Sequence, residues 1–315
     1  MWIKSPIKVC KYSHLNIPSG DLRFSITSYC NMNCSYCHNE GGRAKNELPF
    51  KDVMRIIEGA MNYGVKSIRL TGGEPLIHKD IFTICQEIKT KYPHVSLGVN
   101  TNAVEIHTLL QLITLGYLNK IAVGIDYFDA PISKNSSIGL SSKEILDNIM
   151  RIKNAGGNVD LSVVYNGDLD TIEKLVEWCF QKNIFIKILE IITNETASQP
   201  DKAYQEMANH IIDRYQLEVR YNITKRKYFA VSSNNNGIAF LNSHCRLREC
   251  EICARLHMRV SSEGSARVCL YANTPDFSLL DDEMFHRNFR AAVTYLGTSP
   301  EKYIAMSEEY KETPQ

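Results

Sequence analysis

Short apolar runs alternate with longer amphipathic segments from Leu22 onward. Apolar runs of this length predict strands, and segments with apolar residues every three or four positions predict helices. The predicted strands are 22–27, 66–71, 95–99, 119–125, 158–165 and 184–191. The predicted helices are 50–63, 79–91, 104–115, 141–155 and 168–182. Repeated strand–helix units predict a parallel α/β sheet with right-handed crossovers.

Periodicity leaves two architectures open, an open doubly wound sheet and an incomplete barrel. In both, functional groups gather at the C-terminal ends of the strands. After residue 195 the pattern changes to a helix and short strands near 217–222, 227–231 and 238–241, with a polar hairpin turn at 232–237. Helices are expected over 281–296 and 301–311. These changes predict a lead-in segment (1–20), a strand–helix domain (21–195) and a C-terminal α+β domain with a helical tail (196–315).

Composition narrows the class of protein. The 315 residues are 44% hydrophobic and carry a formal net charge of +1, which favours neither an extended nucleic-acid interface nor a polybasic membrane anchor. No apolar run approaches the roughly 20 residues that span a bilayer. The N-terminus lacks the apolar region and cleavage site of a secretory signal, so a reducing, cytoplasmic location is expected.

Six of the ten cysteines fall into two groups, 30/34/37 and 250/253/269. In a cytosolic enzyme, grouped cysteines indicate metal rather than disulfides. The first group directly follows the first predicted strand. Three thiolates on one loop are suited to an iron–sulfur cluster whose remaining iron has no protein ligand and is open to a small-molecule cofactor. The second group alone is also compatible with zinc.

The second strand ends in Gly72-Gly73-Glu74-Pro75. A glycine pair lets a ligand approach the backbone, and Glu74 offers an acceptor to a bound amine, although a Gly-Gly turn closed by proline is the commoner explanation of such a motif. The Cys30, Cys34 and Cys37 triad, Tyr36 within it and this turn together resemble the radical SAM superfamily.

That resemblance implies a partial (β/α)6 barrel. It also implies a [4Fe–4S] cluster on Cys30, Cys34 and Cys37, with S-adenosylmethionine (SAM) bound to the open iron. Reductive cleavage of SAM then gives a 5′-deoxyadenosyl radical that abstracts hydrogen from a substrate. The cofactor is expected to contact Tyr36, Gly72, Gly73, Glu74, Asn102 and Gly124.

The spacing of Cys253, Gly264 and Cys269 resembles half of the motif of SPASM/Twitch auxiliary domains. This resemblance implies a second [4Fe–4S] cluster on Cys250, Cys253 and Cys269. Its fourth ligand is substrate, Cys245 or His244. The substrate would then lie between the two clusters.

Most of the chain resembles the GTP 3′,8-cyclase family, from Asp21-Leu22-Arg23 through the Leu70–Pro75 turn to Cys250–Cys269. By that resemblance, Arg23, Arg69 and Arg255 bind substrate. Several positions depart from the family pattern: Asp160 replaces a phosphate-neutralising lysine, His257 an arginine, Gly124 a hydroxyl residue and Asn100 a threonine, and the C-terminal Gly-Gly is missing. Because an aspartate repels a triphosphate, these departures predict a paralogue with a different substrate.

The leading hypothesis is therefore a radical SAM enzyme acting on a small-molecule or nucleotide-like substrate, reduced by a donor such as flavodoxin or ferredoxin. A SPASM/Twitch-type peptide-modifying maturase is the first alternative, disfavoured because only about 20 residues precede the first strand, whereas a leader-binding domain needs roughly 80. A zinc-binding regulatory protein is the alternative from another class.

Overall fold

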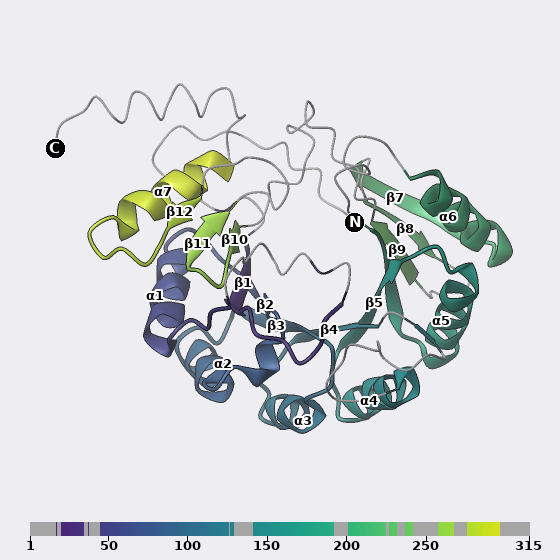
Figure 1. Cartoon of the computed structure of the whole chain (residues 1–315), viewed down its shortest axis with the longest axis horizontal. Helices are drawn as coiled ribbons and strands as arrows, with labels where there is room; N and C mark the ends of the chain where they lie inside the picture. The colour runs from purple at the N-terminus through teal and green to yellow at the C-terminus, as the bar shows by residue number, and fades with distance from the viewer. Residues whose placement is uncertain are drawn as a thin grey trace.

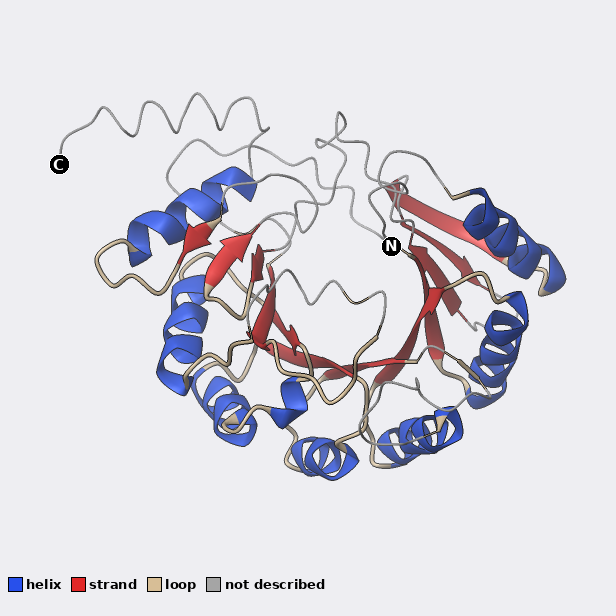
Figure 2. Ribbon diagram, viewed as in Figure 1, coloured by secondary structure: helices blue, strands red, loops and turns tan. Residues whose placement is uncertain are grey.

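The computed structural model describes residues 17, 20–34, 37, 45–125, 127–128, 141–191, 201–224, 227–231, 237–241, 258–267 and 276–296. One twelve-stranded sheet curves into an open arc. Helices cover its convex side (Figures 1 and 2). The two ends of the arc do not meet, so the sheet forms a partial barrel.

Six strand–helix units build the centre of the arc. Their strands pair in parallel and in chain order, which is the connectivity of a barrel and excludes the doubly wound alternative. The predicted strands and helices of this region are confirmed. Their bounds are β1 (Asp21–Thr27), α1 (Phe50–Met61), β2 (Ser67–Gly72), a 3-10 turn η2 (Pro75–Ile77), α2 (Ile81–Lys91), β3 (Ser96–Thr101), α3 (Ile106–Thr114), β4 (Lys120–Gly124), α4 (Ser142–Asn154), β5 (Val159–Tyr165), α5 (Leu169–Lys182) and β6 (Phe185–Glu190).

Later segments extend the same sheet at both edges. At the β6 edge follow α6 (Lys202–Arg214), β7 (Glu218–Thr224), β8 (Lys227–Val231) and β9 (Gly237–Leu241), with β9 parallel to β6. At the β1 edge lie β10 (Met258–Val260), β11 (Ser265–Arg267) and β12 (Phe277–Ser278), followed by α7 (Phe285–Leu296). The sheet is thus continuous across residue 195. The division into domains stays a prediction, and the helix expected over 301–311 lies outside the described residues.

Alternating residues give the sheet two chemically different faces. Leu22, Ile68 and Leu97 pair across β1, β2 and β3 and are fully buried in the apolar core under the helices. Their neighbours along the strands, among them Arg23 and Arg69, point to the concave side. The apolar face therefore holds the barrel together, and the polar face is left for function.

Helix ends and apolar helix faces follow the sequence. Ser141 and Glu144 form a capping box at the start of α4, and Asp168 caps α5. Cys85 and Cys179, on α2 and α5, are completely buried, as expected of small hydrophobic residues outside the cysteine groups.

Candidate active site

The cysteine loop leaves the C-terminal end of β1 and is closed at its base. After the loop the chain returns beside β1, where the Ser28 amide donates to the Asn46 carbonyl oxygen (2.8 Å) and the Leu48 amide to that of Ile26 (3.0 Å). The Asn46 amide also donates to the Ser28 hydroxyl oxygen at 2.6 Å. Within the loop, the Cys37 amide donates to the Cys34 carbonyl oxygen (3.1 Å). These bonds hold the thiols above the end of the barrel.

The Gly72–Gly73 pair packs directly on the start of this loop. The Gly73 amide donates to the Thr27 carbonyl oxygen and the Glu74 amide to that of Tyr29, both at 2.8 Å. A Cβ atom would lie 2.1 Å from the Thr27 oxygen at Gly72 and 2.0 Å from the Tyr29 oxygen at Gly73. Glycine is required because backbone meets backbone here, and this contact places the residue before Cys30.

Glu74 joins the glycine turn to the end of β3. Its side chain is 1% exposed, and it accepts hydrogen bonds from the Thr101 hydroxyl (2.8 Å), the Asn102 amide (2.8 Å) and the Leu76 amide (3.1 Å). Burial raises the pKa of Glu74 to about 7, although these donors favour the carboxylate. Both carboxylate oxygens thus accept from the protein, and the predicted contact of Glu74 with a cofactor stays a prediction.

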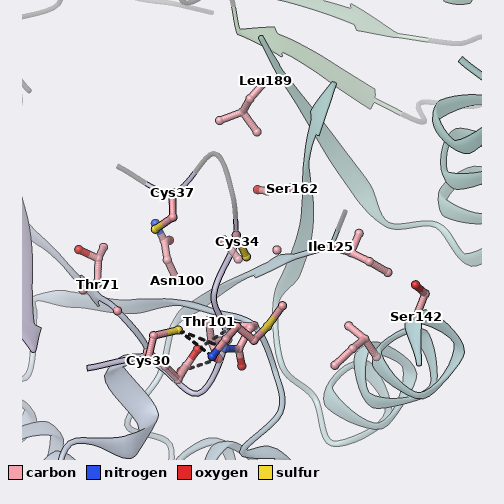
Figure 3. A pocket seen from close by; sticks show the side chains of 18 of the residues that line it. Cys30, Cys34, Cys37, Thr71, Asn100, Thr101, Ile125, Ser142, Ser162 and Leu189 are labelled. Carbon is pink, nitrogen blue, oxygen red and sulfur yellow. Dashed lines mark hydrogen bonds between the residues drawn. The ribbon is translucent and has the colours of Figure 1, made fainter. Parts of the chain in front are cut away.

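A cavity of about 300 Å³ opens between the cysteine loop and the strand ends (Figure 3). Of the residues expected from the sequence, eight line it: Cys30, Cys34, Cys37, Gly72, Gly73, Glu74, Asn102 and Gly124. Tyr36, Arg255, Cys250, Cys253, Cys269, Cys245 and His244 lie outside the described residues. The lining also includes Thr71 and Leu189, near the ends of β2 and β6, and Ser162, in the middle of β5, none of which the sequence interpretation named as site residues.

The three thiols suit a cluster better than a single ion. Cys30 and Cys34 are half-buried, Cys37 is exposed, and all three face one cavity. No three ligating side chains of the described segments come close enough together to hold one metal ion. A cubane cluster binds each thiolate at a different iron, so its ligands stay apart. Burial raises the pKa of the Cys30 thiol, and coordination to iron would keep it deprotonated.

A row of basic residues crosses the concave face below this cavity. The strand registers align Arg259, Arg23 and Arg69 across β10, β1 and β2, and continue the row through Gly98 to Lys120. Thr71, two residues after Arg69, lines the cavity, so the row lies on the same face one step nearer the strand starts. Arg23 and Arg69 are thus placed beneath the cavity rather than in its wall.

Arg69 lies over a glycine and keeps one free donor. A Cβ atom at Gly98 would be 2.9 Å from the Arg69 guanidinium carbon, so the missing side chain makes room for it. The Arg69 Nη1 atom is buried and has no hydrogen-bond partner among the described residues. Burial lowers the pKa of Arg69, while Asp160 and Asp21 oppose that shift. A buried, unpaired guanidinium nitrogen calls for an acceptor.

Asp160 is neutralised by its neighbours. Its carboxylate is buried. It accepts a hydrogen bond from Lys187 Nζ at 2.6 Å and forms an ion pair with Lys120 Nζ at 2.9 Å, and the two lysines come from the strands on either side. With Arg69, three cations surround one carboxylate, a formal excess of two positive charges. The negative charge of Asp160 is therefore compensated locally, by lysines that the sequence did not show to reach it, while a substrate other than a triphosphate stays a prediction.

The family model of the radical SAM superfamily matches residues 24–179. This segment contains β1 to α5 almost entirely, with the cysteine loop and the glycine turn on one cavity. The protein is a radical SAM enzyme. Its resemblance to GTP 3′,8-cyclases is also confirmed. That of Sulfurovum sp. (strain NBC37-1) is 25% identical over 265 residues, or 79% of each chain. A probable GTP 3′,8-cyclase from Thermoplasma volcanium is 24% identical over 295 residues, or 88% of each chain.

Solved structures share the fold. Streptococcus suis SuiB bound to S-adenosylmethionine superimposes with a TM-score of 0.61 at 17% identity, covering 84% of this chain and 63% of SuiB. The chain thus spans less than two thirds of SuiB. Native anSMEcpe with bound AdoMet gives 0.57 at 13% identity, covering 85% of this chain and 79% of that protein. These likenesses confirm the predicted α/β partial barrel.

Proposed function

We propose that this radical SAM enzyme holds a [4Fe–4S] cluster on Cys30, Cys34 and Cys37 and cleaves SAM reductively to abstract hydrogen from a substrate. The observation that carries the proposal is the convergence of these three thiols and the glycine turn on one cavity. SuiB and anSMEcpe, which share the fold, are both described with SAM bound. The cluster, when bound, supplies the electron that cleaves SAM.

The chain's own residues position the reactants and exclude water. Apolar side chains of Met32, Ile125, Ile145 and Leu189 line the cavity beside the thiols. Such a lining protects a reactive radical from solvent. Thr71 contributes a buried hydroxyl with no partner among the described residues, available to a bound ligand. We further propose that the enzyme is cytoplasmic and that flavodoxin or ferredoxin reduces its cluster. No described helix has the length and apolarity to cross a bilayer.

A second cluster on Cys250, Cys253 and Cys269 is part of the proposal, supported by their spacing and by the cyclase relatives. Iron and sulfide analysis of the anaerobically reconstituted protein should give about eight irons per chain, and Cys253→Ala about four. Four irons in the unmodified protein would exclude the second cluster. Zinc without sulfide would contradict the proposed clusters and favour the hypothesis of a zinc-binding regulatory protein.

The three cations around Asp160 favour a substrate with one compact anionic group, such as a carboxylate or a single phosphate. Arg69, Lys120 and Lys187 supply the charge, and Arg69 the free donor. A triphosphate carries about four negative charges, and Asp160 offsets one of the cations that would balance them. We therefore infer a small anionic substrate other than GTP. Arg255, by its resemblance to the cyclase family, is a further candidate anchor.

Removing Lys187 should weaken anion binding. In the cluster-loaded protein, we expect Lys187→Met to lower the affinity for inorganic phosphate about tenfold, because the excess of two positive charges falls to one. The affinity is measured by calorimetric titration of each variant with inorganic phosphate. Lys174→Met, at a half-exposed position on α5 paired with Asp170, is the matched control and should bind phosphate like the unmodified protein. Equal phosphate affinity in the two variants, or consumption of GTP with SAM, would contradict the proposed substrate class.

A further inference from the structure

The turn after β3 is held in an unfavourable conformation. Ala103, fully buried, has φ +57°, a backbone region that residues with a Cβ seldom adopt. Three hydrogen bonds keep it there: the Ala103 amide donates to the Thr101 hydroxyl oxygen (2.9 Å), the Asn148 carboxamide to the Ala103 carbonyl oxygen (3.1 Å), and the Asn102 amide to Glu74 (2.8 Å). Strain that is held by several elements marks a site with a positional requirement.

This turn aims the side chain of Asn102. The Val104 amide donates to Asn102 Oδ1 at 3.0 Å, which identifies the oxygen and leaves the Nδ2 group pointing the other way. Nδ2 then donates to Asn31 Oδ1 at 2.7 Å and reaches Cys30 Sγ at 3.9 Å. Asn31 in turn reaches Glu105 at 3.5 Å. The side chain of Asn102 thus contacts the cysteine loop at two neighbouring residues, the first expected cluster ligand, Cys30, and Asn31, which follows it.

We propose that Asn102 is a positioning residue for Cys30, whose sulfur it orients and whose negative charge it stabilises through an N–H···S hydrogen bond. The inference rests on the proposed cluster at Cys30, Cys34 and Cys37. A donor to a ligating sulfur favours the more negative, reduced cluster and raises its reduction potential. The Met32 amide, 3.3 Å from the same sulfur, acts in the same sense from within the loop.

The test is the midpoint potential of this cluster, measured by an EPR-monitored redox titration. Cys253→Ala serves as background, so that signals of a second cluster do not interfere. Asn102→Ala removes the donor. Asn102→Asp keeps the acceptor for Val104, so the turn can form, but replaces the donor with a carboxylate. Both variants should shift the potential to more negative values, Asn102→Asp further, and should lose iron to a chelator several-fold faster. Asn154→Ala, an exposed residue at the end of α4, is the matched control.

A purely structural role would lower the melting temperature without moving the potential. Potentials of both variants equal to that of Asn154→Ala would therefore overturn the inference while leaving the proposed function intact. If Asn102→Ala does not fold, the shift of Asn102→Asp decides alone. Failure of the unmodified protein to take up any cluster at Cys30, Cys34 and Cys37 would instead reject the proposed function together with the inference.

Discussion

Cys34→Ala should abolish the production of 5′-deoxyadenosine from SAM. Cys34 lies in the middle of the loop and faces the cavity together with Cys30 and Cys37. With one of three thiolates removed, the proposed cluster has too few protein ligands to persist. We expect a decrease of at least about a hundredfold, since the uncatalysed reduction has no comparable route. The measurement is chromatography of the products after anaerobic reconstitution, reduction with dithionite and addition of SAM.

The matched control is the same substitution at a cysteine outside the cavity. Cys85 is completely buried on α2, against the convex side of the sheet, and its thiol has a pKa raised to about 12 by burial. Cys85→Ala should therefore keep its iron content and its SAM cleavage. Retained 5′-deoxyadenosine production by Cys34→Ala would refute the assignment of the cluster to this loop.

Gly73→Ala should reduce SAM cleavage nearly as much as Cys34→Ala does, although it removes no cluster ligand. The new methyl group would lie 2.0 Å from the Tyr29 carbonyl oxygen, which is backbone and cannot rotate away. The glycine turn and the cysteine loop would have to separate, breaking the bonds from the Gly73 amide to Thr27 and from the Glu74 amide to Tyr29. We expect SAM cleavage to fall about a hundredfold, and iron analysis after reconstitution should show most of the first cluster missing.

Gly116→Ala separates this clash from a general effect of replacing glycine. Gly116 lies two residues after the last residue of α3 and has φ +71°, but a Cβ atom there would have open space around it. That variant should lose about 1 to 2 kcal/mol of stability, because a residue with a Cβ is strained at this positive φ, and should keep its iron and its SAM cleavage. Normal iron content and turnover in Gly73→Ala would show that the close approach of the two backbones does not position the cluster.

The sequence was sufficient for the central barrel because local pattern and global fold agree there. Each strand from β1 to β6 is an apolar run long enough to recognise, and each helix carries a periodic apolar face. Strands β10 to β12 escaped prediction because they are three, three and two residues long. Segments so short have no measurable periodicity, and their pairing at the edge of β1 depends on the sheet already formed there.

Part of the candidate site could likewise be predicted from the sequence, and part could not. Cys30, Cys34 and Cys37 and the glycine turn could be found from the sequence, because ligands on one loop are close in the chain. By its resemblance to the cyclase family, the sequence also predicted Asp160 as a departure from the family pattern, but only the tertiary structure showed that its charge is paired. Lys120 and Lys187 come from different strands and reach Asp160 through pairing in the sheet. Interactions between distant residues depend on register and strand order, which local patterns do not contain.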